Sequence, residues 1–304
     1  MALQKLQVIG TKLCDRSGKP VQLRGISTLG FRYPEYITRE AFESLKNEWG
    51  INLIRLAMYT DEPGGYCTDG DREELKRIMI KGVEIATELS MYVIIDWHIL
   101  LEKSPLVYKD EAIAFFDEMA ALFADYTNVL YEICNEPQES PFASVIRPFA
   151  LEVIPTIRKH DKDAVIIVGT DNWSQDVDDV IGNAVDDKNV MYALHFYAAS
   201  HQDKLMKKAV TALEGGVPIF ISECSICDAS GDGILDRDWG GRWIDWADSN
   251  DISYVVWNLS NKDESSAILR PDSTSLANWH QDEYSETGLW FKQRIFSALS
   301  RENH

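Results

Sequence analysis

The chain has 304 residues, of which 45% are hydrophobic and 26% are charged. This composition excludes disorder and supplies enough apolar material for a large core. The formal net charge of −19 disfavours nucleic acid and anionic membrane surfaces as partners. Because no linker, low-complexity tract or repeat divides the chain, we expect one domain spanning residues 1–304.

Short apolar, β-branched runs alternate with longer amphipathic stretches along the chain, as is typical of βα units around a parallel sheet. The segment Gln7–Cys14 around Gly10 predicts a small β-hairpin capping the barrel floor. The predicted strands are Val21–Ile26, Asn52–Met58, Tyr92–Trp97, Val129–Ile133, Ala164–Val168, Val190–Phe196, Pro218–Ser222 and Ile252–Trp257. The predicted helices are Arg39–Trp49, Asp71–Leu89, Asp110–Tyr126, Phe142–His160, Asp203–Glu214, Asp238–Ser249 and Leu289–Leu299. Eight strands alternating with helices predict an α/β fold, a closed (β/α)8 TIM barrel.

Five cysteines are scattered along the chain, at Cys14, Cys67, Cys134, Cys224 and Cys227. Their odd number and wide spacing do not fit the disulfide framework of a small secreted domain. The last two form a C-x-x-C pair, which suits a redox pair or half a zinc site, but no second pair lies nearby. We therefore expect incidental cysteines, no metal site and no cofactor.

Polar residues gather at the C-terminal ends of the predicted strands, where barrel enzymes place their chemistry. They are Arg55, Asp96, His98, Asn135, Glu136, His195, Glu223 and Trp257. Each residue alone has an ordinary structural explanation, such as an ion pair, a hydrogen-bonded core histidine or aromatic packing. Together they predict an enzyme, because a barrel would bring all of them to one rim.

Two glutamates in this set suit glycoside hydrolysis. Glu136 follows the fourth predicted strand and Glu223 follows the seventh. A retaining mechanism needs two carboxyl groups about 5–5.5 Å apart, one with a raised pKa that donates a proton and one ionised that attacks carbon. Opposite sides of a barrel mouth can provide that spacing.

A family resemblance rests on the segment Asn135-Glu136-Pro137, preceded by Val129-Leu130-Tyr131-Glu132-Ile133. It resembles the acid/base motif of glycoside hydrolase family 5, to which many bacterial endoglucanases belong. Further segments resemble motifs of that family in the same order, and together they span most of the chain. These segments are Pro20-Val21-Gln22-Leu23-Arg24-Gly25-Ile26-Ser27, Asn52-Leu53-Ile54-Arg55, Asp96-Trp97-His98, Leu194-His195-Phe196-Tyr197, Ile221-Ser222-Glu223 and Trp257-Asn258-Leu259-Ser260.

The resemblance implies a role for each matched residue. Glu136 is implied as general acid/base and Glu223 as nucleophile, with Arg55 and Tyr197 orienting Glu223 and keeping it ionised. His195 is implied to couple to Glu136, Asn135 to bind the sugar 2-hydroxyl, and His98 to bind the sugar above a Trp257 platform. By similarity to the loops of bacterial cellulases, the residues expected to bind glucan are Trp173, Gln175, Lys262 and Glu264. For Trp173, packing within the protein is an equal alternative.

The sequence departs from the cellulases that it resembles in two loops. Leu29 stands where a histidine is usual, and Tyr33 replaces a tryptophan, so we name Tyr33 as a candidate substrate-binding residue. After Glu223, the usual Trp-Gly pair is replaced by Cys224-Ser225-Ile226-Cys227. This second change could loosen the loop, admit another substrate or allow a contact between the two cysteines.

The sequence therefore predicts a retaining endo-β-1,4-glucanase acting on cellulose-like or mixed-linkage β-glucans. The same chemistry on mannan or xyloglucan is the nearest alternative. A non-catalytic carbohydrate-binding barrel and a metallohydrolase using Asp96, His98 and His195 are further alternatives. We expect a β-glucan polysaccharide or oligosaccharide as the partner, a monomer, and secretion with the leader already removed, because a polymer must meet its enzyme outside the cell.

Overall fold

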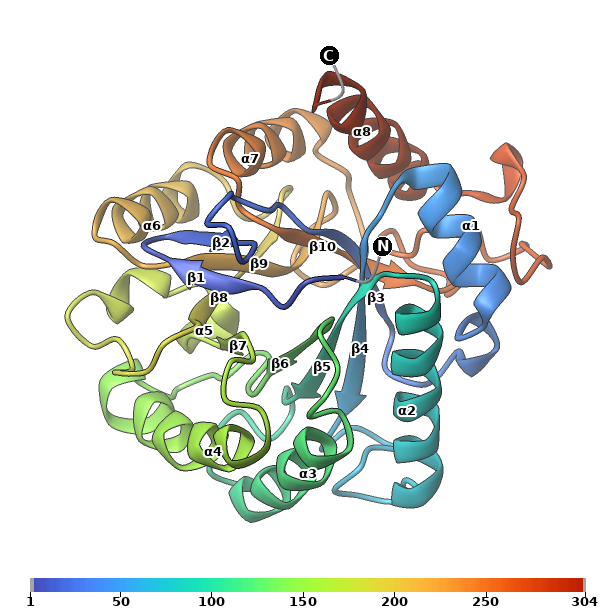
Figure 1. Cartoon of the computed structure of the whole chain (residues 1–304). Coiled ribbons are helices and arrows are strands. Elements are labelled where there is room, and N and C mark those ends of the chain that lie inside the picture. Colours follow the sequence, from blue (N-terminus) through green and yellow to red (C-terminus); the bar gives the residue numbers. More distant parts are fainter. Residues whose placement is uncertain (1–2, 303–304) are drawn as a thin grey trace.

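A computed structural model describes residues 3–302, and the side chains of residues 3–298. Parallel strands close into a barrel in the order β10-β3-β4-β5-β6-β7-β8-β9 (Figure 1). The strands are β3 (Arg24–Thr28), β4 (Leu53–Tyr59), β5 (Tyr92–His98), β6 (Val129–Glu132), β7 (Ile166–Val168), β8 (Val190–Tyr197), β9 (Ile219–Ser225) and β10 (Tyr254–Leu259). The predicted (β/α)8 barrel is confirmed, with shifts of a few residues at the strand ends.

Helices surround the barrel and cover the outer faces of its strands, apart from the short α5, which lies at the cavity rim (Figure 1). They are α1 (Arg39–Trp49), α2 (Arg72–Glu88), α3 (Lys109–Leu122), α4 (Arg147–His160), α5 (Asp171–Ser174), α6 (Asp203–Glu214), α7 (Arg237–Ser249) and α8 (Glu286–Glu302). One predicted helix changes type, because Phe142–Ile146 forms a π-helical turn before α4 begins. The connection after β7 was predicted without a helix, and it contains only the short α5 and a 3-10 turn.

Helix boundaries follow capping chemistry that is readable in the sequence. Thr38 accepts a hydrogen bond from the backbone N–H of Ala41 at the start of α1, and Asp236 caps α7 in the same way. Gly50 ends α1 with φ +77°, a left-handed conformation that glycine adopts without steric cost. Within residues 3–302, no helix has the length and apolar character needed to cross a membrane.

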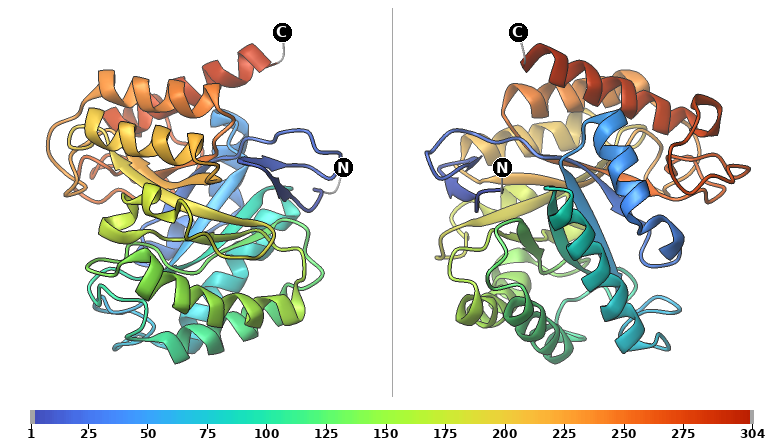
Figure 2. Two further views of the ribbon diagram at one scale, coloured as in Figure 1. Left: turned by 90° about the vertical axis from the view of Figure 1, so that its left-hand side faces the viewer. Right: turned by 45° about the vertical axis from the view of Figure 1, so that its right-hand side comes forward.

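The predicted N-terminal hairpin is present and closes one end of the barrel. Strands β1 (Gln7–Ile9) and β2 (Lys12–Cys14) pair antiparallel. In Figure 2 the hairpin lies against the end of the barrel nearest the N-terminus. Leu6 and Leu13 pack into the apolar cluster that fills this end, and the Tyr92 hydroxyl donates to the Gln4 carbonyl at 2.8 Å. The hairpin therefore seals the apolar floor, as expected.

The side chains that point into the barrel change from apolar to charged over two residues along each of four strands. Residues two positions apart share one face of a strand. At the floor, the inward side chains on four strands join one buried apolar cluster: Leu53, Ile94, Leu130 and Ala193. Two positions further along the same strands, in the same order, are Arg55, Asp96, Glu132 and His195. This charged layer supports the mouth of the barrel.

Candidate active site

A cavity of about 550 Å³ lies at the C-terminal ends of the barrel strands. Most of the site residues predicted from the sequence line it: Glu136, Glu223, His98, His195, Tyr197, Trp257, Trp173, Gln175, Lys262 and Glu264. Arg55 and Asn135 are fully buried next to these residues. Tyr33 stacks on Tyr36 with ring centroids 6.3 Å apart and packs against the cluster that contains Tyr197 and Trp257, so its contact with substrate stays a prediction. The fold thus brings the predicted residues together at one place.

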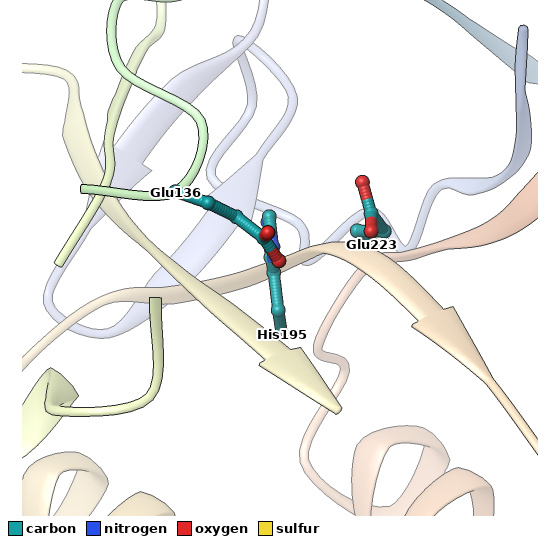
Figure 3. A group of neighbouring side chains, drawn as sticks. All are labelled: Glu136, His195 and Glu223. Atoms are coloured by element: carbon teal, nitrogen blue, oxygen red, sulfur yellow. The ribbon is translucent and has the colours of Figure 1, made fainter. Parts of the chain in front are cut away.

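Two carboxyl groups face each other in this cavity. Glu136, His195 and Glu223 each contribute one atom to a group whose members all lie within 4.8 Å of one another. Figure 3 shows Glu136 beside His195, with Glu223 on the neighbouring strand. Inverting glycosidases separate their carboxyl groups by about 6.5–9.5 Å, and retaining ones by about 5–5.5 Å. The close approach of Glu136 and Glu223 fits the retaining arrangement.

Two hydrogen-bond donors hold the Glu223 carboxyl group. The Tyr197 hydroxyl donates to Oε1 at 2.6 Å, and Arg55 Nη1 donates to Oε2 at 3.0 Å. Burial, and then the nearby Glu223 charge, raise the pKa of Tyr197 well above its usual range, so its phenol remains a donor. The two donors therefore hold one oxygen each and fix the orientation of the Glu223 carboxyl group.

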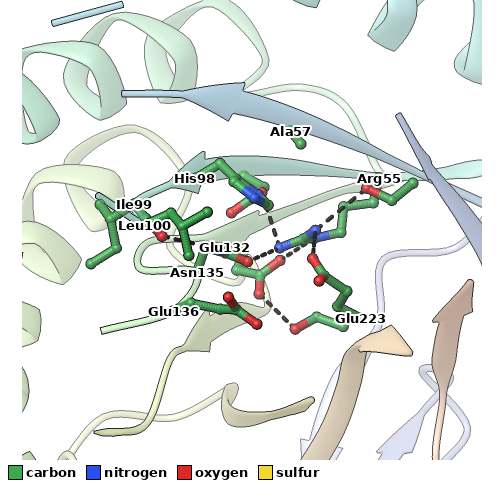
Figure 4. Close-up of polar contacts among 12 residues, drawn as sticks. Arg55, Ala57, His98, Ile99, Leu100, Glu132, Asn135, Glu136 and Glu223 are labelled. Carbon is green, nitrogen blue, oxygen red and sulfur yellow. Dashed lines mark hydrogen bonds and ion pairs between the residues drawn. The ribbon is translucent and has the colours of Figure 1, made fainter. Parts of the chain in front are cut away.

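Arg55 also contacts two further buried carboxyl groups, Glu132 and Asp96, and Figure 4 shows Glu132 beside it. Its Nε donates to Glu132 at 2.7 Å, and its Nη2 lies 3.0 Å from Asp96. Burial disfavours the charged form of Glu132, but Arg55 and His195 outweigh it and lower the pKa of Glu132 to about 2. Burial raises the pKa of Asp96 well above its usual range despite Arg55, and Glu132 and Glu223 add to this shift. One guanidinium therefore organises three buried acidic groups.

His195 is the hydrogen-bond partner of Glu136. Its Nδ1 lies 2.9 Å from Glu136 Oε1, and its Nε2 lies 2.9 Å from the Ser222 hydroxyl. Burial lowers the pKa of this histidine, but Glu132, whose Oε1 lies 3.8 Å from Nε2, and the hydrogen-bonded Glu136 outweigh burial and raise it to about 9. The pair can therefore hold a proton beside the cavity at neutral pH.

His98 faces the same cavity in a different electrostatic setting. Its ring stacks on Trp257 with centroids 5.2 Å apart, and its Nδ1 lies 2.7 Å from Asp96. Burial, followed by the charge of Arg55, lowers the pKa of His98 to about 3. A neutral His98 next to the Trp257 ring gives the cavity one polar and one flat apolar surface.

A β-bulge explains how two adjacent residues of β9 both reach the interior. Two-residue steps on β8 and β10 match three-residue steps on β9, since the paired residues are Ala193 with Phe220, His195 with Glu223, Tyr254 with Ile221 and Val256 with Cys224. An extra residue of this kind redirects side chains, and bulges are common next to active sites. As a result, Ser222 contacts His195 while Glu223 contacts Arg55.

Asn135 is held from two sides. Its Oδ1 accepts from Arg55 Nη2 at 2.6 Å, and its Nδ2 donates to the Ile99 carbonyl at 3.0 Å. The next residue in the chain is Glu136, so these contacts also fix the start of the loop that carries the proposed acid. The implied contact of Asn135 with a sugar hydroxyl stays a prediction.

Trp173 lies at the rim with 43% of its surface exposed. It sits in an uncommon turn in which Asn172, Trp173 and Ser174 all have φ between +56° and +58°. Such residues are strained, by about 1–2 kcal/mol each, and persist only where other contacts hold them. Here the Ser174 hydroxyl donates to the Asn135 carbonyl at 2.6 Å, and the Trp173 N–H donates to the Pro137 carbonyl at 3.1 Å. Exposure at the cavity favours substrate contact over simple packing for Trp173.

The remaining rim residues come from the loop after β10. Lys262 forms an ion pair with Glu264, whose other carboxylate oxygen accepts from Asn258 at 2.9 Å and from Ser266 at 3.1 Å. Glu264 is therefore fixed, while the Lys262 side chain remains 45% exposed. This arrangement presents an oriented polar edge to the cavity.

The two loops that depart from the family have clear structural outcomes. Leu29 lines the cavity, so an apolar surface stands where the resemblance expects a histidine. Cys224 packs in the main core, whereas Cys227 joins a separate cluster with Tyr197 and Trp257. Both thiols are free and buried, and burial is the main cause that raises their pKa values, that of Cys227 to about 12. No disulfide therefore joins Cys224 and Cys227, and the two side chains pack in different clusters.

The metallohydrolase alternative placed Asp96, His98 and His195 around an ion. Among the described side chains, the group of three possible ligands is Glu136, His195 and Glu223 instead. His98 directs Nδ1 to Asp96, and His195 directs its two nitrogens to Glu136 and Ser222. The geometry therefore does not assemble the metal site of that alternative.

Sequence reasoning missed several residues of the site, and four of them bear on its chemistry. Tyr59 and His201 line the cavity, and Glu132 and Ser222 form its buried support. Glu132 carried a usable signal, because a charged residue in the middle of a buried strand needs a partner. Ser222 carried none, since the bulge that turns it inward is not visible in a run of apolar residues.

The fold and the facing carboxyl groups define a glycoside hydrolase barrel, and comparison with known proteins agrees. The family model described as "Cellulase (glycosyl hydrolase family 5)" matches residues 14–263. Endoglucanase A of Butyrivibrio fibrisolvens is 44% identical over 295 residues, covering 96% of this chain and 68% of the relative. An endoglucanase of Clostridium saccharobutylicum is 42% identical, covering 96% of this chain and 65% of the relative.

The solved structures give the same result. The catalytic domain of the Thermobifida fusca endoglucanase Cel5A, as a glutamate-to-glutamine variant in complex with cellotetraose, superposes with a TM-score of 0.91. It is 38% identical, and the match covers 96% of this chain and 97% of that one. This chain belongs to glycosyl hydrolase family 5, as the sequence predicted, and is a glycoside hydrolase. It spans about two thirds of the length of the curated relatives named above.

Proposed function

We propose that this chain is a retaining endo-β-1,4-glucanase in which Glu136 is the general acid/base and Glu223 the nucleophile. The observation that carries the proposal is the pair of carboxyl groups within 4.8 Å of each other in two different environments. Glu223 accepts hydrogen bonds from a guanidinium and a phenol, whereas Glu136 contacts a histidine. Such different environments assign different tasks to two chemically identical groups.

The proposed reaction has two steps. In the first, Glu223 attacks the anomeric carbon and forms a glycosyl-enzyme ester while Glu136 protonates the leaving oxygen. In the second, Glu136 takes a proton from water, and that water displaces Glu223 from the sugar. Tyr197 and Arg55 hold Glu223 during both steps, because each binds a different carboxylate oxygen.

Flat and polar surfaces around the cavity suit a glucan chain. We propose that Trp257 and Trp173 bind sugar faces, while His98, Gln175, Lys262 and Glu264 bind hydroxyl groups. The Thermobifida fusca relative, crystallised with cellotetraose, supports a β-1,4-linked glucose chain as substrate. Leu29 provides an apolar surface at the rim, so we expect weaker binding of the sugar there than a histidine would give.

All residues of the proposed site come from one chain, so we propose that the enzyme acts as a monomer. We also propose that it works outside the cell, because cellulose-like polymers cannot enter one. Size-exclusion chromatography with light scattering tests the first point. Detection of the protein in the culture medium of its source tests the second.

The direct test measures loss of viscosity and release of reducing sugar from carboxymethylcellulose and barley β-glucan. Wild type should reduce viscosity early, and Glu223→Gln and Glu136→Gln should each lose at least about a thousandfold in rate. Glu139→Gln is a matched control, because Glu139 lies on the same loop and pairs with Lys103 at the surface. Full activity in either glutamate variant would contradict the site, whereas activity restricted to mannan or xyloglucan would change only the substrate.

A further inference from the structure

A continuous series of hydrogen bonds joins the two proposed catalytic carboxyl groups through the barrel interior. From Glu136 it runs through the ring of His195 to the Ser222 hydroxyl, with both contacts 2.9 Å long. Ser222 donates to Glu132 Oε1 at 2.6 Å, and Glu132 Oε2 accepts from Arg55 Nε at 2.7 Å. Arg55 completes the series at Glu223. Ser222 and Glu132 have no exposed surface, so they act on substrate only through their neighbours.

The direction of each hydrogen bond follows from the chemistry of the groups. Glu132, with its pKa lowered to about 2, is ionised at neutral pH and can only accept. The Ser222 hydroxyl must therefore donate its single proton to Glu132. The lone pairs of the Ser222 oxygen then face His195 Nε2. Nε2 must then carry a hydrogen. With Nε2 protonated, the contact between Nδ1 and Glu136 can hold one proton, on either atom.

We propose that Ser222 and Glu132 are positioning residues that fix the proton of His195 on Nε2, so that the proton shared with Glu136 is the one delivered to the leaving group. When that proton leaves, a carboxylate and an imidazole lone pair face each other. This unfavourable state favours recovery of a proton from the attacking water in the second step. Atoms balance over the two steps, because the proton given to the leaving oxygen is replaced by one from water.

The neighbours of His195 agree with this assignment. The charged and titratable groups that act on it are Glu132, Glu136, Glu223, Asp96, His98 and His201. Glu136 contacts the ring, and Glu132 lies behind Ser222 with its Oε1 3.8 Å from Nε2; the two glutamates raise the pKa of His195 to about 9 against the effect of burial. The pair should therefore keep its shared proton until the solution becomes clearly alkaline.

The inference rests on the proposed function and is tested by pH profiles. We would measure kcat/KM between pH 5 and 10 for wild type, Ser222→Ala, Ser222→Thr and Glu132→Gln. The substrates are cellopentaose, whose leaving group needs a proton, and 2,4-dinitrophenyl β-cellobioside, whose leaving group does not. For cellopentaose, Ser222→Ala and Glu132→Gln should move the alkaline midpoint down by about one pH unit, the effect of one hydrogen bond to a charged group.

The second substrate and two further variants separate positioning from general damage. Rates on the dinitrophenyl substrate should show no such shift, and Ser222→Thr, which keeps the hydroxyl, should restore the wild-type profile. Ser253→Ala removes another buried serine hydroxyl, at the barrel floor, and should lower thermal stability without moving the midpoint. If Ser222→Ala does not fold, Glu132→Gln and nitrogen NMR of His195 in wild type address the same question.

An unchanged alkaline midpoint in both Ser222→Ala and Glu132→Gln would overturn the inference, as would a His195 resonance showing an unprotonated Nε2 at neutral pH. Either result leaves the proposed function intact if wild type cleaves cellopentaose. Failure of the proposed function would appear differently, as absence of cleavage of both substrates by wild type itself.

Discussion

The floor and the mouth of the barrel are built from the same strands but from opposite kinds of side chain. At the floor, Leu53, Ile94 and Leu130 are buried in an apolar cluster beneath the N-terminal hairpin. Two positions further along, Arg55, Asp96 and Glu132 are equally buried but ionisable. The comparison separates two tasks: burial of apolar surface stabilises the fold at the floor, whereas burial of charge at the mouth costs stability and prepares chemistry.

The largest effect should come from removing the cation of the mouth. Arg55→Met leaves Asp96, Glu132 and Glu223 without their shared partner, so we expect a loss of about 3–5 kcal/mol in unfolding free energy. The rate on barley β-glucan should fall at least about a hundredfold. Urea unfolding and initial rates measure both effects.

Arg77→Met is the surface control for this change, since Arg77 pairs with the exposed Glu74 and its own side chain is 65% exposed. Its effect should stay within about 0.5 kcal/mol. Equal destabilisation by the two substitutions would show that the charged layer does not depend on Arg55.

Truncation at the floor should affect stability and spare catalysis. Ile94→Ala should lower the unfolding free energy by about 2–5 kcal/mol, and Ile94→Val by about 0.5–1.5 kcal/mol, because each leaves a cavity in a close-packed layer. Below the unfolding transition, kcat on cellopentaose should match wild type for both variants. A kcat that falls in proportion to the lost stability would contradict the claim that the floor affects stability without affecting catalysis.

A pH-dependent effect concerns two buried histidines of the mouth with opposite pKa shifts. The pKa of His195 is raised to about 9, so its contribution to stability is complete below its usual 6.5 and is lost as pH rises through 9. The pKa of His98 is lowered to about 3, so stability falls as pH drops from 6.5 towards 3, where only the unfolded chain binds the proton. Urea midpoints between pH 4 and 10 measure both trends.

The two trends can be assigned with one variant each. His195→Gln should flatten the alkaline side of the stability profile, and His98→Gln should flatten the acid side. If His195→Gln left the alkaline side unchanged, the raised pKa assigned to His195 would be wrong.

Much of the barrel was predictable because its signals are local. Runs such as Val93-Ile94-Ile95 are apolar on successive positions, as strands buried on both faces must be, and caps such as Thr38 mark where helices begin. Because both faces of such a strand are apolar, the sequence does not show which residues face the barrel interior. It therefore did not show that Glu132 points inward. The site residues at strand ends were predicted correctly because a closed barrel brings the C-terminal ends of all its strands to one rim.

The features that escaped prediction depend on geometry that no residue pattern records. The bulge in β9 turns Ser222 and Glu223 to the same side, and only the paired registers of β8 and β10 reveal it. The exposed position of Trp173 likewise depends on a strained turn held by contacts to the Glu136 loop. The position of Tyr33, between Tyr36 and the cluster that contains Tyr197 and Trp257, also depends on packing that the sequence does not record.

The sealed floor closes the barrel at the end opposite the cavity. Leu6 and Leu13 of the hairpin region fill the end away from the cavity, so among the described residues the cavity opens at the mouth and not through the floor. A glucan chain must therefore lie across the entrance and cannot thread through the barrel. Both halves of a cut chain depart sideways along the surface, which permits an attack at any bond that can settle over the two carboxyl groups.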